Sequence, residues 1–219
     1  NKMKVPPTAV INIIRENLND RYHKGFPILK ELVQNADDAE ATQLHLGWVK
    51  SLGRVQHPLL GGPGLFVVNN GAFTADDGEA IDCIGLSSKA GSKFSVGKFG
   101  LGLKSIFHVC ESFFYIAIDE QTGQTVAHMV NPWADSEGKD EFHQGWAEFS
   151  VADQRAVVDY LKPVLQQSRF FCLWIPLRRQ DQLQGHAPIT KDFPGEANYP
   201  PQFLTEHCDT QLATLLPML

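Results

Sequence analysis

The chain has 219 residues, of which 43% are hydrophobic and 20% charged, and its formal net charge is −6. These values are typical of a globular protein with one large core, and the acidic balance argues against a surface that binds duplex nucleic acid directly. The four cysteines are far apart, and no apolar run could form a membrane span or a signal core, which predicts a cytoplasmic protein without a zinc cluster or a disulfide framework.

The first third of the chain predicts two helices followed by two strands. Thr8 is expected to cap a helix over 9–18, and apolar residues at helical spacing predict a second helix over 26–39. Alternating apolar and polar residues over 43–49 and the apolar run 65–68 are typical of strands. A turn signal, Asn-Asn-Gly, follows the second strand.

The rest of the chain predicts strands with helices between them. Thr74 is expected to cap a helix, 85–99 has the Gly, Ser and Lys content of a long mobile loop, and 100–109 is a turn leading into a helix. Further predicted elements are the strands 113–118, 125–130, 146–151 and 170–177 and a helix over 151–167. This order favours an α+β fold, a two-layer sandwich with helices on one face of a mixed, mostly antiparallel sheet.

One face of the helix over 26–39 carries polar groups beside its apolar residues. Glu31, Asn35 and Asp38 are spaced i, i+4 and i+7, so their side chains point the same way. A carboxylate can act as a general base on water, and an amide oxygen suits Mg²⁺ that also binds phosphates. The alternative is a solvated polar edge on an amphipathic helix.

A glycine-rich segment follows the predicted mobile loop. Gly97, Gly100 and Gly102 form a G-x-x-G-x-G pattern, which differs from the Walker A motif and from the dinucleotide-binding motif. Such glycines allow the backbone to approach a phosphate closely, although they also occur as simple turn residues. The nearby lysines either screen phosphate charge or are solvated; they are Lys89, Lys93, Lys98 and Lys104.

Three blocks occur in one order: ELVQNADDA (31–39), VVNNG (67–71) and SSKAGSKFSVGKFGLGLKSIFHV (87–109). Together they resemble the GHKL ATPase superfamily, and most closely its sacsin-type and heat-shock-chaperone-type domains. The resemblance implies a Bergerat ATP-binding fold over 1–178, with an ATP lid at about 85–99.

The resemblance also implies roles for individual residues. Glu31 would be the general base, Asn35 would ligate Mg²⁺, Asp38 would lie near the ribose or the nucleotide rim, and Asn69 would face the adenine of ATP or ADP. The other implied nucleotide-binding residues are Gly71, Ser88, Lys89, Gly97, Lys98, Phe99, Gly100, Leu101 and Gly102.

The sequence departs from the family's pattern in two places. The family has an Asp in a D-x-G motif that accepts a hydrogen bond from the adenine amino group, and Asn69 stands there; its amide oxygen accepts without charge. A Gly-Thr that usually precedes a late strand is replaced by Phe170 and Phe171. The first change bears on adenine affinity or base selectivity, and the Thr that the second place lacks lies near the adenine in the family.

The expected function is an ATP-binding and slowly hydrolysing module of a larger multidomain protein, in which lid closure drives a chaperone-like or defence-type conformational change. One alternative is a nucleotide- or partner-binding switch without turnover, and another is a DNA-acting GHKL ATPase. The first residue is not Met, and 179–219 resembles a linker or arm, so further domains of the same polypeptide are expected partners, with a protein client or a dimer partner.

Overall fold

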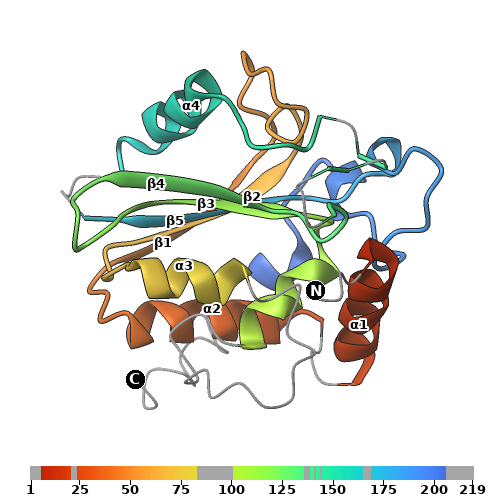
Figure 1. Ribbon diagram of the computed structural model, residues 1–219, viewed down its shortest axis with the longest axis horizontal. Coiled ribbons are helices and arrows are strands. Elements are labelled where there is room, and N and C mark those ends of the chain that lie inside the picture. Colours follow the sequence, from red (N-terminus) through yellow and green to blue (C-terminus); the bar gives the residue numbers. More distant parts are fainter. Residues whose placement is uncertain are drawn as a thin grey trace, which may run out of the picture.

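The computed structural model describes residues 6–20, 24–82, 101–135, 139–140, 142–143, 145–164 and 169–205. Its described part contains one antiparallel sheet with the strand order β1-β2-β5-β3-β4 (Figure 1). The strands are β1 (Leu44–Val49), β2 (Gly64–Asn69), β3 (Phe113–Ile118), β4 (Thr125–Val130) and β5 (Phe171–Pro176). The central strand, β5, is therefore the last one in the sequence, and every one of its residues is buried.

Helices pack on the sheet and complete the predicted α+β sandwich. In Figure 1, α1 (Pro7–Asp20), α2 (Phe26–Asp38), α3 (Ala75–Asp82) and the 3₁₀ helix η2 (Leu101–His108) lie on one side of the sheet. The helix α4 (Val151–Leu161) lies on the other side. None of the helices in the described part combines the length and the apolar character needed to cross a bilayer.

The sheet's α4 side is organised by a row of aromatic residues. Phe66, Trp174 and Phe114 are neighbours across β2, β5 and β3, with ring centroids 6.2 and 6.0 Å apart, and Tyr160 of α4 meets this row at Trp174. The Phe66 ring extends over Gly47 of β1, where a Cβ would lie 2.1 Å from it. The glycine makes room for the ring.

Three local predictions differ from the structure. The helix predicted over 151–167 ends at Leu161, two residues before Pro163, whose ring cannot continue a helix. Residues 146–151 form an irregular segment and not a strand, because Trp146 and Phe149 are buried core residues and Ser150 caps α4 through the Asp153 backbone N–H. Thr8 does not cap α1, since the helix already begins at Pro7. The predicted cap of α3 is confirmed, because the Asp77 backbone N–H donates to Thr74 Oγ1.

The described part of the predicted arm packs against the domain. Its 3₁₀ turns are η3 (Gln180–Gln182), η4 (Pro194–Glu196) and η5 (Gln202–Leu204), and the last of these contacts α2. Arg15 of α1 donates to the carbonyl of Pro188 at 2.7 Å, and the side chain of Ile189 is buried. Its role as a link to a further domain stays a prediction.

Candidate functional site

The helix α2 presents the predicted row of polar side chains. Its apolar residues, among them Ile28 and Leu32, face the core. As a result, Glu31, Asn35 and Asp38 lie along one edge of the buried face of the helix. Burial is greatest in the middle of this row: Glu31 is half-buried, Asn35 is buried and Asp38 is exposed. The row thus offers a partly desolvated carboxylate next to a desolvated amide.

Asn35 is buried without being satisfied. It is 9% exposed, and its Nδ2 has no hydrogen-bond partner among the described residues. An unpartnered buried polar group costs about 1–3 kcal/mol, and a bound ion, water or ligand is one way in which a protein satisfies it. The Nδ2 group therefore has an unused hydrogen-bonding capacity, one helical turn after Glu31.

Glu31 lies against the glycine-rich segment. A Cβ built on Gly102 would lie 1.7 Å from Glu31 Oε2 and 2.4 Å from its Cδ, so the carboxylate occupies the space that any other residue at 102 would fill. η2 packs beside α2 in the same region (Figure 1). The structure thus brings the predicted general base to one of the predicted phosphate-binding glycines, from positions 71 residues apart.

The turn after β2 docks on the end of α2. Asn69 is buried, and its Oδ1 accepts a hydrogen bond from the Gly71 backbone N–H at 2.9 Å. A Cβ on Gly71 would lie 2.6 Å from the Cβ of Ala39, so only glycine permits this approach. The Ala72 N–H donates to the Ala39 carbonyl at 3.1 Å. This contact places Asn69 beside the end of α2, where Asp38 is located.

The remaining predicted residues lie largely outside the described residues. Leu101 begins η2, but only its backbone is described. The predicted lid over 85–99 lies outside the described part, as do the site residues Ser88, Lys89, Gly97, Lys98, Phe99 and Gly100. Of the four nearby lysines, Lys104 is described, and it is 3% exposed and therefore not a solvated surface residue.

The model of the Sacsin domain family matches residues 8–184. The chain belongs to the Sacsin-domain family. Human Sacsin is 35% identical to it over 117 residues, which cover 48% of this chain but only 2% of that relative. The resemblance to the sacsin-type GHKL domains, predicted from the motifs, is thereby confirmed.

A charged cluster at the end of α3 was not predicted from the sequence of this Sacsin domain. The His128 ring of β4 bridges two carboxylates, Asp82 Oδ1 at 3.1 Å and Glu148 Oε1 at 2.8 Å. The hydrogen bond to Asp82, followed in size by the one to Glu148, raises the pKa of His128 to about 10. The imidazolium therefore ties α3 to the sheet edge at neutral pH. No sequence signal marks this cluster, since its members are 20 or more residues apart.

We expect the free energy of unfolding to fall as the pH rises from about 6.5 to about 10, because the folded-state pKa of His128 lies above the ordinary histidine value of 6.5. The stabilisation from the His128–Asp82 and His128–Glu148 ion pairs is fully present below about pH 6.5, and it is lost as the pH approaches about 10. The side chain is 42% exposed, so we expect a loss of no more than about 1 kcal/mol. Urea titrations at pH 6, 8 and 10 of the wild type and of His128→Gln measure it, and equal pH dependence of the two proteins would contradict the assignment.

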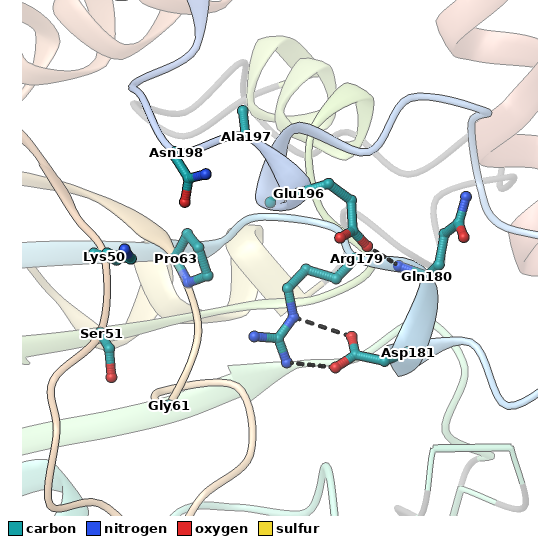
Figure 2. Close-up of a pocket in the computed structure, with 11 residues that line it drawn as sticks. Lys50, Ser51, Gly61, Pro63, Arg179, Gln180, Asp181, Glu196, Ala197 and Asn198 are labelled. Carbon is teal, nitrogen blue, oxygen red and sulfur yellow. Dashed lines mark hydrogen bonds and ion pairs between the residues drawn. The ribbon is translucent and has the colours of Figure 1, made fainter.

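An open groove of about 650 Å³ lies away from α2 in this Sacsin domain. Figure 2 shows Lys50 and Pro63 on one side and Glu196 of the arm on another, with Arg179 paired to Asp181 at 3.0 Å. The groove contains none of the predicted site residues, and its charges are of both signs. We therefore place the candidate site at α2, Gly102 and Asn69, and not in this groove.

Proposed function

We propose that this Sacsin-type domain binds ATP or ADP with Mg²⁺ and hydrolyses ATP slowly, as a module of a larger multidomain protein. The observation that carries this proposal is the contact between the Glu31 carboxylate and Gly102, next to the unsatisfied buried amide of Asn35. Hydrolysis of a phosphoanhydride requires mainly positioning and charge stabilisation, and these residues supply a base, a polar anchor and close access to the backbone.

In this proposal, each described residue has a separate task. Glu31 accepts the proton of the water that attacks the terminal phosphorus, and ADP leaves as the bridging P–O bond breaks. The Asn35 amide oxygen would hold Mg²⁺, which would neutralise phosphate charge when bound. Asn69 Oδ1 has a second lone pair beyond the one used by Gly71, and this lone pair can accept a hydrogen bond from the adenine amino group.

The proposed module acts through its neighbours. The segment 85–99 would close over the bound nucleotide and change the contacts of the domain with further domains, a client protein or a dimer partner. Both the chaperone-like and the defence-type role use this cycle. Membership in the Sacsin-domain family supports the first of these.

A switch that binds nucleotide or a partner without turnover is the second candidate. Phe171, which stands where the family's pattern has a Thr near the adenine, pairs directly with Asn69 across β2 and β5. Its ring is buried and stacked on Phe73 at 5.4 Å, so it fills space that a Thr would leave open. This bulk next to Asn69 favours weak or altered base recognition.

Titration calorimetry of the wild type with ATP, with and without Mg²⁺, tests the proposed site. We expect binding that requires Mg²⁺, and we expect Asn35→Ala to lose the Mg²⁺ dependence and to weaken Mg²⁺-ATP binding by about tenfold or more, since one direct ligand is removed. Gln34→Ala is the matched control, because Gln34 is an exposed amide on the same helix. Wild type that does not bind at millimolar nucleotide refutes an autonomous nucleotide module, and unchanged Mg²⁺ dependence in Asn35→Ala refutes the ligand role.

A further inference from the structure

A buried ion pair joins the end of β5 to the segment after η2. Arg178 lies two residues after the end of β5 and Glu111 two residues before the start of β3, and their side chains are 0% and 1% exposed. Arg178 Nε donates to Glu111 Oε1. A buried guanidinium is tolerated only when its charge and all its N–H groups are satisfied, so its other partners show what it holds in place.

Three of these partners are backbone carbonyls at the C-terminal end of η2. Arg178 donates to the carbonyls of Phe107, His108 and Cys110 at 2.7, 2.8 and 2.6 Å. The last carbonyls of a helix lack intrahelical partners, and a positive charge there is favourable. Arg178 therefore caps the segment whose N-terminal turn contains Gly102.

The other partners come from the arm. Arg178 Nη1 also donates to Thr190 Oγ1 at 2.7 Å and to the Asp192 carbonyl at 3.0 Å. Thr190 Oγ1 in turn donates to the His108 carbonyl at 3.1 Å, and Glu111 Oε1 accepts from the Ile189 N–H at 3.0 Å. The Thr190 hydroxyl and the Glu111 carboxylate thus attach residues 189–192 to the same end of η2.

The hydrogen bonds between Arg178, the end of η2 and the arm form together when the arm is docked. Removing the arm would leave the Arg178 guanidinium without two of its acceptors, and the His108 carbonyl would lose the Thr190 hydroxyl as one of its two donors, which is costly at a buried site. A partial displacement of residues 189–192 is also unfavourable, because it would leave buried donors or acceptors of the network without a partner. Docking of the arm and the position of η2 are consequently linked.

We propose that Arg178 is a positioning residue for the nucleotide site: with Glu111 it fixes η2 so that Gly102 stays against Glu31, and it couples this contact to docking of residues 189–195. The inference rests on the proposed function. By reciprocity, a nucleotide bound at Glu31 and Gly102 stabilises the docked arm, and a partner that pulls the arm away weakens nucleotide binding by the same factor.

Thr190→Val on the whole chain tests the coupling, because it keeps the shape of the side chain and removes only its hydrogen bonds. Thr205→Val is the matched control, since this exposed hydroxyl of the arm bonds, among the described residues, only the nearby Gln202 carbonyl. We expect Thr190→Val to speed backbone hydrogen exchange severalfold over 101–109 without nucleotide and to raise the Kd for Mg²⁺-ATP about 3- to 10-fold. Mg²⁺-ATP is expected to slow exchange over 189–195 in the wild type and to do so less in the variant.

Arg178→Lys is the second variant, because an ammonium keeps the charge but cannot reach all of these acceptors in one plane. We expect its Kd to rise at least as much as in Thr190→Val at a temperature where circular dichroism shows both to be folded. Unchanged exchange over 101–109 in Thr190→Val, or faster exchange with an unchanged Kd, overturns the coupling. Wild type without Mg²⁺-ATP binding refutes the proposed function itself, and exchange over 101–109 without nucleotide still decides whether Thr190 holds η2.

Discussion

Replacing Glu31 by Gln is expected to lower the rate of ATP hydrolysis by about 10²–10⁴-fold and to change the Kd for Mg²⁺-ATP by less than about threefold. Gln has the shape of Glu, so it still fits against Gly102, but its amide cannot take a proton from water. Phosphate release at saturating Mg²⁺-ATP measures the rate, and calorimetry measures the Kd.

Glu16→Gln is the control for this experiment, since Glu16 is an exposed carboxylate on α1. Its hydrolysis rate should equal that of the wild type. If Glu31→Gln loses binding together with hydrolysis, the carboxylate has a structural role. If the rate is unchanged, another group activates the water.

Replacing Glu111 by Gln is expected to lower the free energy of unfolding by about 3–5 kcal/mol, because it leaves the buried Arg178 guanidinium without its counter-charge. A loss of this size is a large part of the 5–15 kcal/mol that ordinarily stabilises a domain. Urea denaturation followed by circular dichroism measures it in the absence of nucleotide.

Asp181→Asn provides the comparison on the surface. Asp181 pairs with Arg179, one residue after Arg178, but its side chain is 67% exposed, so we expect a loss below about 1 kcal/mol. Similar losses for Glu111→Gln and Asp181→Asn would show that the backbone carbonyls alone satisfy Arg178. The expected difference would show that burial makes the Glu111 charge necessary.

Local sequence patterns were sufficient for most helices and strands. The apolar spacing of α2 predicted both its bounds and the shared direction of Glu31, Asn35 and Asp38, because helical geometry alone relates these positions. The segment 146–151 shows where such patterns fail: Trp146 and Phe149 are buried by tertiary packing, and apolar residues in an irregular core segment imitate a strand.

The sequence by itself determined most of the elements, the family resemblance and the polar row on α2, since each depends on patterns within short segments of the chain. Only the tertiary structure decided that Glu31 meets Gly102, that Gly71 docks on Ala39, and that Arg178 pairs with Glu111 across 67 residues. These contacts depend on the order β1-β2-β5-β3-β4, which places the last strand at the centre of the sheet. Strand order follows from how the whole core is buried, and no local periodicity encodes it.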